Sequence, residues 1–165
     1  VALESADSDF RALFERVCDD AYGLAHAKRV QFTSRIDSGI GVVRCDASRI
    51  QQALSNVLGN AIKFTSSEGG AVRFDAALRG NRIECVVCDT GPGIASEHLN
   101  TIFEPFIRMD AGGETTGLGL GLNIARKLIE LHGGTITAES DGPGRGATFR
   151  IQLPLSRLGA APSQG

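Results

Sequence analysis

Residues 46–64 read Asp46-Ala-Ser-Arg-Ile-Gln-Gln-Ala-Leu-Ser-Asn-Val-Leu-Gly-Asn-Ala-Ile-Lys-Phe64, which is the most regular pattern in the sequence. Its apolar residues recur at the i, i+3, i+4, i+7 spacing of one helical face, and Asp46 is a residue type that caps helices. The pattern predicts a helix over 47–64 with a buried face. Asn56, Asn60 and Lys63 share a second stripe beside that face. Such a stripe fits an ordinary solvated surface, and it also fits a site for Mg²⁺ and phosphate.

Weaker patterns on both sides of this helix predict the remaining elements. Residues 1–8 look irregular, with Asp7 or Ser8 as the cap of the first helix, and Ser96 is the expected cap of a short one. The order of elements predicts an α+β fold with helices stacked on one face of a mixed, mainly antiparallel sheet. We expect helices over 10–25, 96–102 and 119–132, and strands over 30–36, 42–45, 72–78, 82–89, 135–139 and 148–155.

Composition bounds the class of protein. The chain has 165 residues, 42% of them apolar, which suits a single globular domain. Its 21 glycines are about twice the usual share, but they follow no Gly-X-Y period. A net charge of −2 does not indicate a nucleic-acid surface, and no apolar run is long enough to span a membrane. We therefore expect a domain in direct contact with neither nucleic acid nor membrane.

Four cysteines occur, at positions 18, 45, 85 and 88. Cys85 and Cys88 match the C-x-x-C pattern of redox or zinc sites. They fall on a predicted strand, however, where residues three apart point to opposite faces. We expect the cysteines to act as small buried apolar residues of a reduced cytoplasmic protein.

A second motif, Asp89-Thr-Gly-Pro-Gly93-Ile94, directly follows an apolar strand. An aspartate at a strand end can accept a hydrogen bond from an exocyclic amine, and nearby glycines let backbone approach a flat ring. A plain turn is one alternative. The other is an aspartic protease, which shares the Asp-Thr-Gly signature but needs two such carboxylates, hence here a homodimer.

The third motif, Gly117-Leu-Gly-Leu-Gly121-Leu122, runs into the last predicted helix. Glycines at a helix N-terminus present free N–H groups and the positive end of the helix dipole, which favours phosphate. No Gly-Lys-Ser/Thr follows, so this is not a Walker A loop. It follows a loop rather than a strand, so it is a poor dinucleotide fingerprint.

In this order the motifs resemble those of the catalytic ATP-binding domain of sensor histidine kinases, in the GHKL superfamily. Residues 56–65 resemble the N box, 89–94 the G1 box, 103–106 the F box and 117–122 the G2 box, while 146–149 resemble the closing strand motif. The match spans about residues 10–155. It implies a two-layer α/β sandwich of the Bergerat type that binds ATP and Mg²⁺.

The resemblance also implies roles for single residues. Asn60 would ligate Mg²⁺ with support from Asn56, and Asp89 would accept the adenine amine, assisted through water by Thr148. Gly93 would leave room for the ring. Residues 103–118 would form a lid over the nucleotide, where Leu118 replaces a more common Thr. The expected catalytic set is Asn56, Lys63 and Arg108, and the further nucleotide contacts are Phe64, Gly91, Ile94, Phe103, Phe106, Thr116, Gly117, Leu118, Gly119, Leu120, Gly121 and Leu122.

Asn56 stands where hydrolysing members of the superfamily carry a glutamate, and an amide cannot act as a general base. The resemblance therefore implies little hydrolysis and transfer of the γ-phosphoryl group to a partner. The acceptor would be a histidine followed by an acidic residue, and none of His26, His98 and His132 is so placed. We expect that this chain does not phosphorylate itself.

These inferences predict a domain plan and a set of partners. Residues 1–9 would be the remnant of a linker from a dimerisation segment, 10–155 the ATP-binding domain and 156–165 a flexible tail or linker. The expected partners are ATP, the dimerisation and histidine-phosphotransfer domain of the same kinase and, indirectly, a response regulator receiver domain. We expect a cytoplasmic monomer cut from a longer kinase, which can itself be membrane-anchored. The alternative is a nucleotide-binding regulatory module without phosphotransfer.

Overall fold

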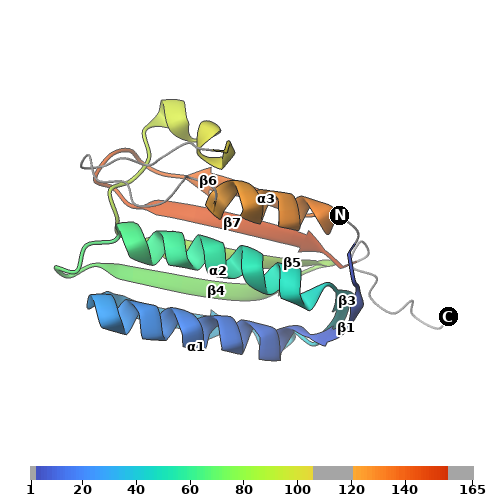
Figure 1. Ribbon diagram of the computed structural model, residues 1–165. Coiled ribbons are helices and arrows are strands. Elements are labelled where there is room, and N and C mark those ends of the chain that lie inside the picture. The colour runs from blue at the N-terminus through green and yellow to red at the C-terminus, as the bar shows by residue number, and fades with distance from the viewer. Residues whose placement is uncertain (1–2, 106–120, 156–165) are drawn as a thin grey trace.

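Helix α2 (Ala47–Phe64) lies between α1 (Phe10–Lys28) and α3 (Gly121–Leu131) in a single helical layer (Figure 1). The computed structural model describes residues 3–105 and 121–155. The Asp46 carboxylate accepts the Arg49 N–H and begins α2, as predicted. Helix α1 is capped by Asp9, not by Asp7 or Ser8. All three helices cover the same face of a sheet.

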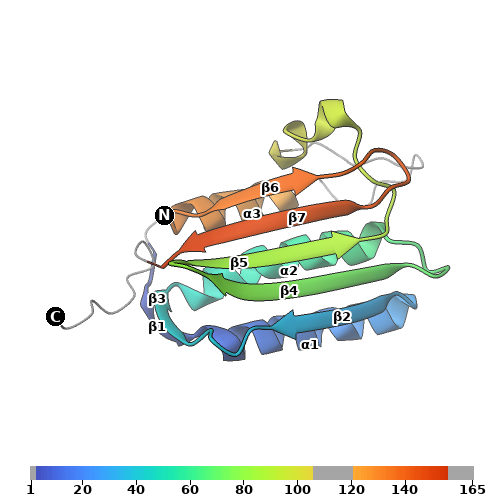
Figure 2. The same cartoon turned by 180° about the vertical axis from the view of Figure 1, so that it is seen from behind.

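That sheet has five strands in the order β2-β4-β5-β7-β6 (Figure 2). Strands β2 and β4 are parallel, and every other neighbouring pair is antiparallel. The predicted mixed, mainly antiparallel sheet with helices on one face is thus confirmed. The strands are β2 (Gln31–Ile36), β4 (Ala71–Arg79), β5 (Arg82–Asp89), β6 (Thr135–Glu139) and β7 (Ala147–Pro154).

A second, two-stranded sheet pairs β1 (Ala6–Asp9) with β3 (Val42–Cys45) in antiparallel register. Strand β3 was predicted with these bounds, whereas β1 lies in the segment expected to be irregular. None of its four side chains is buried, and its sequence, Ala-Asp-Ser-Asp, accordingly shows no alternation of apolar and polar residues. Pairing with β3 alone makes it a strand.

The short helix predicted over 96–102 is also wrong in form. Two separate 3₁₀ turns, Ser96–His98 and Thr101–Phe103, stand in its place. Ala95, not Ser96, precedes the first turn, and no side chain caps it. Most of the predicted lid (103–118) and the predicted tail (156–165) lie outside the described residues.

The core fills the space between the helical layer and the sheet. Phe14 of α1 packs against Phe10, at 5.5 Å between ring centroids, and against Phe74 of β4, at 5.8 Å. The predicted face of α2 is buried throughout, from Ile50 to Ile62. Within the described ranges, no helix combines the length and the apolar character needed to cross a membrane.

Candidate functional site

Three segments distant in the sequence meet where β5 ends: the last turns of α2, the turn after β5 and the start of β7. Together they line one pocket. The predicted N box and G1 box therefore face each other across it. Its lining residues are Asn60, Ala61, Phe64, Asp89, Pro92, Gly93, Ile94, Ala147 and Phe149.

Asp89 ends β5 with a half-buried side chain. Its Oδ1 accepts the Gly91 N–H at 2.8 Å. Burial raises the pKa of Asp89 above its usual value, and hydrogen bonds from the backbone N–H groups of Gly91 and Ala147 only partly offset that effect. A carboxylate held this way in a mostly apolar pocket is a specific acceptor for an N–H donor of a ligand.

Thr148 and Asp89 line a second pocket together at the β6–β7 turn, and assistance through water stays a prediction. Ala147 pairs with Asp89, while Thr148 pairs with Cys88, one residue further along. Because successive side chains point to opposite faces of a sheet, Thr148 faces away from the helical layer. Its Oγ1 lies 3.4 Å from the Sγ of Cys88. The residue beside Asp89 on the pocket side is Ala147, which sequence reasoning did not select.

Gly91 and Gly93 have separate reasons to be glycine. A Cβ at Gly91 would lie 2.9 Å from Asp89 Oδ1, so a side chain would disturb the carboxylate. Gly93 has φ +74°, and a Cβ there would lie 2.1 Å from the carbonyl oxygen of Gly142. Gly93 must therefore be glycine because the β6–β7 turn packs against it. From the sequence alone, Gly93 was expected only to leave room for a ring.

The polar stripe of α2 divides into three environments. Asn60 lines the pocket. Asn56 Nδ2 donates to the Gly121 carbonyl oxygen at 3.2 Å, which ties α2 to the first residue of α3. Lys63 is exposed, with Nζ 5.4 Å from the centroid of the Phe64 ring. Asn56 thus acts on the helix that follows the predicted G2 box.

Only part of the predicted F and G2 boxes can be placed. Phe103 is buried and packs edge-on against Phe149, at 6.1 Å between ring centroids. The Arg126 guanidinium lies over the Phe103 ring, 5.7 Å from its centroid. Gly121 and buried Leu122 begin α3. The predicted residues Phe106, Arg108, Thr116, Gly117, Leu118, Gly119 and Leu120 lie outside the described residues.

The histidines and cysteines lie away from this pocket's lining. His132 was expected at a helix end or on the surface. It follows α3 but is buried, with Nδ1 2.9 Å from the Leu128 carbonyl oxygen and Nε2 accepting the Asp46 N–H at 3.2 Å. Cys85 is buried in the core, whereas Cys88 faces the opposite side of the sheet, as the strand alternation predicted.

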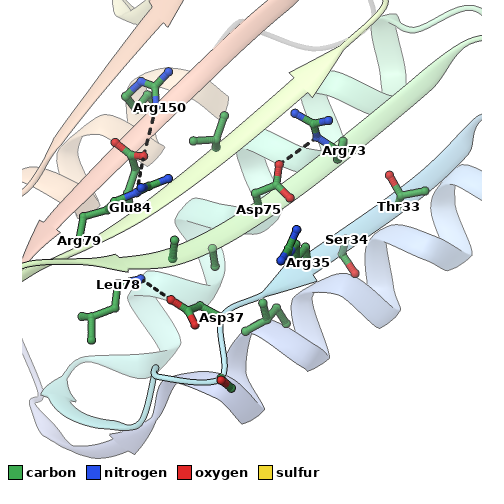
Figure 3. Close-up of a pocket in the computed structure, with 15 residues that line it drawn as sticks. Thr33, Ser34, Arg35, Asp37, Arg73, Asp75, Leu78, Arg79, Glu84 and Arg150 are labelled. Atoms are coloured by element: carbon green, nitrogen blue, oxygen red, sulfur yellow. Dashed lines mark hydrogen bonds and ion pairs between the residues drawn. The ribbon is translucent and has the colours of Figure 1, made fainter.

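A wider groove of about 1050 Å³ lies on the face of the sheet without helices, and it contains none of the predicted site residues (Figure 3). Its acidic groups are already engaged. Asp75 pairs with Arg73 at 2.9 Å, Glu84 lies 3.3 Å from Arg150, and Asp37 accepts the Leu78 N–H at 3.3 Å. Mutual pairing makes this a solvated polar face, so size alone does not locate the site.

A family model described as histidine kinase-, DNA gyrase B- and HSP90-like ATPase matches residues 45–157, more than half of the chain. The chain belongs to this ATPase family. The matched range contains the pocket and all four predicted boxes. Together with the histidine kinases that the chain resembles in sequence and structure, this match confirms the catalytic ATP-binding domain of a sensor histidine kinase and the expected fold class.

Relatives of this ATPase domain are longer proteins. It is 41% identical over 142 residues to an uncharacterized sensor-like histidine kinase of Rhizobium meliloti (strain 1021), covering 85% of this chain and 27% of that protein. It is 32% identical over 157 residues to the adaptive-response sensory kinase SasA of Synechococcus sp. (strain JA-2-3B'a(2-13)), covering 94% of this chain and 41% of the kinase. The chain thus spans well under half of either relative.

Solved structures of histidine kinases also resemble this chain. Full-length ShkA in complex with AMPPNP superimposes with a TM-score of 0.80 at 34% identity, over 93% of this chain and 32% of ShkA. The catalytic domain of histidine kinase ThkA superimposes with a TM-score of 0.79 at 29% identity, over 92% of this chain and 96% of that domain. The described part of the ATPase domain therefore has the fold of a histidine kinase catalytic domain.

Proposed function

We propose that this domain binds ATP with Mg²⁺ and donates the γ-phosphoryl group to a histidine on a separate phosphoacceptor domain. The observation that carries the proposal is the convergence of Asp89 and Asn60 on one pocket from different elements. One pocket thus holds a carboxylate that would accept the base and an amide that would bind the cation. ShkA, a structural neighbour, has been solved with the ATP analogue AMPPNP, which supports the same ligand class here.

The pocket suits adenine. The Asp89 carboxylate would accept the exocyclic amine, and the side chains of Ile94, Phe149 and Ala61 offer apolar surface to the ring faces. Phe103 holds Phe149 from behind through its edge-on contact. A base with an amine donor would therefore bind, and a base lacking that donor would leave the half-buried carboxylate without its partner.

The donor set also suits Mg²⁺ delivered with the nucleotide. Asn60 provides a carboxamide oxygen, a hard ligand of the kind this ion accepts. Within the described ranges, no three or more His, Cys, Asp or Glu residues gather into a metal site. Mg²⁺ bound mainly by phosphates and waters needs few protein ligands, and it would neutralise phosphate charge.

Transfer to a partner is favoured over hydrolysis because of Asn56. Its Nδ2 is already hydrogen-bonded to the Gly121 carbonyl oxygen, and an amide cannot take a proton from water. In the transfer, an imidazole nitrogen of the acceptor forms a bond to the γ-phosphorus. The bond from that phosphorus to the β,γ-bridging oxygen breaks, and ADP leaves with the electron pair. Lys63, exposed beside the site, and Arg108 would offset the phosphate charge.

Transphosphorylation tests the proposal directly. The purified domain is mixed with a dimerisation domain that contains the acceptor histidine, in the presence of Mg²⁺ and γ-labelled ATP. We expect acid-labile label on the acceptor and none when its histidine is replaced by glutamine. If the chain serves a response regulator, a receiver domain should then remove the label. The structural neighbour ThkA has been solved in complex with response regulator protein TrrA.

The second candidate is a nucleotide-binding regulatory module, favoured by the same pocket without the transfer step. ATP binding without label on any acceptor would select it. The aspartic protease alternative has lost its support, because Asp89 belongs to an ATPase fold and its pocket partner is Asn60. Under the protease alternative, Asp89→Asn would abolish peptide cleavage and leave ATP binding intact.

A further inference from the structure

Ser140, the first residue after β6, uses its whole hydrogen-bonding capacity at the junction of two turns. Its Oγ accepts the Ile94 N–H at 3.0 Å and the Gly142 N–H at 3.2 Å. It lies 2.7 Å from the Gly146 carbonyl oxygen and 3.3 Å from that of Gly142. A hydroxyl has one proton and two acceptor positions, so the two N–H groups fill the acceptors and the proton goes to the nearer carbonyl, Gly146.

The two turns that Ser140 joins are in close contact elsewhere as well. The Gly144 N–H donates to the Pro92 carbonyl oxygen at 2.6 Å. A Cβ at Gly93 would meet the Gly142 carbonyl oxygen at 2.1 Å, and one at Gly146 would meet the Asp89 carbonyl oxygen at 2.2 Å. The β6–β7 turn therefore packs on both ends of the 89–94 segment, and backbone atoms make these contacts.

Ser140 adds a side-chain link to that packing, and Ile94, which it holds, lines the pocket. Without the hydroxyl, the backbone N–H of buried Ile94 loses its acceptor, and the turn after Asp89 loses its side-chain hydrogen bond to the residue that follows β6. Ser140 is absent from the pocket lining itself. Ser140 lines a neighbouring pocket that also contains Asp89 and Thr148. Its effect on the pocket lined by Asn60 and Asp89 passes through Ile94 and the turn.

We propose that Ser140 is a positioning residue of the nucleotide site, which sets the 89–94 turn at the distance from α2 that adenine requires. The proposal rests on the function proposed above. It concerns affinity rather than the transfer step, because the hydrogen bonds of Ser140 go to Ile94, Gly142 and Gly146 and not to Asn60.

ATP binding with Mg²⁺, measured by calorimetry on wild type, Ser140→Ala and Ser140→Thr, tests this role. Loss of the Ile94 and Gly142 hydrogen bonds should weaken binding by Ser140→Ala roughly three- to tenfold. Ser140→Thr keeps the hydroxyl and should restore the affinity. Ser8→Ala is the matched control, because the Ser8 hydroxyl donates to the Ala6 carbonyl oxygen within β1 and Ser8 does not line the pocket.

Two further readouts separate positioning from general destabilisation. In transphosphorylation, Ser140→Ala should raise the KM for ATP and leave kcat nearly unchanged, and hydrogen exchange of the Ile94 amide should accelerate. If Ser140→Ala does not fold, the near-isosteric Ser140→Cys takes its place, since a thiol is a weak acceptor. Wild-type affinity in the variant would overturn the role of Ser140 alone. Absence of ATP binding in wild type would overturn the proposed function and this role together.

Discussion

The half-buried Asp89 carboxylate destabilises the fold when it is ionised, and the same carboxylate is the proposed acceptor for the base. Burial raises its pKa, so the folded chain disfavours the ionised form relative to the unfolded chain. Stability linked to this group is therefore full below the unfolded pKa, near 3.9 for an ordinary aspartate, and is lost as pH rises through the higher folded pKa. Ionising this carboxylate therefore costs more free energy in the folded chain than in the unfolded chain.

We therefore expect Asp89→Asn to raise the melting temperature at pH 7 while ATP binding falls by at least about tenfold, the effect of losing a charge-assisted hydrogen bond. Scanning calorimetry and binding calorimetry on the same samples measure the two effects. ATP affinity of the wild type should also fall on acidification at a pH above that of an ordinary aspartate. A variant that binds ATP normally would exclude Asp89 as the acceptor for the base.

Asn60 gives a prediction that depends on the cation. Asn60→Ala should weaken ATP binding in Mg²⁺ by about 1–3 kcal/mol, the range for one contact to a charged group. In excess EDTA the wild type and the variant should bind alike, because the lost contact is to the ion. Gln52→Ala, an exposed position on the same helix, is the control and should change neither value. Equal affinities in Mg²⁺ would remove Asn60 from the cation site.

At the scale of elements, α2 is the helix whose position decides the site, and its start is held by Asp46. That carboxylate, nearly buried, accepts the N–H groups of Arg49 at 3.3 Å and Glu4 at 2.9 Å, and pairs with Arg49 Nε at 3.7 Å. Asp46→Ala should cost about 1 kcal/mol of unfolding free energy, typical of a lost N-cap. Asp46→Asn keeps an acceptor and should cost less. Urea denaturation measures both, and equal losses would show that charge rather than capping matters.

The elements predicted from sequence are those in which the spacing of apolar residues indicates which face is buried. The α2 face and the Val42–Cys45 strand were obtained with correct bounds, because apolar residues repeat with the period of the element. Strand β1 has no buried side chain and thus no pattern. The two 3₁₀ turns are too short for a period to distinguish them from one helical turn.

The site shows the same division. Asp89, Asn60 and Ile94 were predicted and do line one pocket. They could be predicted because each belongs to a short motif of residues that are neighbours in the sequence. Thr148 lies one residue past Ala147, the register partner of Asp89, and so its side chain points to the other face of the sheet. Its role through water stays a prediction. Ser140 was not predicted, because its bond to Ile94 spans 46 residues and nothing near Ser140 in the sequence marks it.

At the scale of the molecule, the two faces of the sheet have different tasks. The helical face carries the pocket, and the opposite face carries paired charges (Figure 3). Saturating ATP and Mg²⁺ should stabilise the fold by about 2.7 kcal/mol at a hundredfold excess over Kd, a rise of several degrees in melting temperature. Arg73→Ala on the charged face should leave that rise intact, whereas Asp89→Asn should remove it. Thermal shift assays compare all three proteins. An Arg73→Ala protein without the rise would mean that the faces are coupled.

The place of β7 in the sheet bears on how the protein is made. This strand is the last in the described chain, yet it lies between β5 and β6. While the chain is being synthesised, β5 keeps one open edge and β6 has no neighbour until residues 147–154 have left the ribosome. Ala147 and Phe149 arrive with the same strand, so the pocket is completed only after β7 has been synthesised. A nascent chain stalled before β7 would present unpaired strand edges, the form in which sheets aggregate. Such a chain would be bound by chaperones and would not bind ATP.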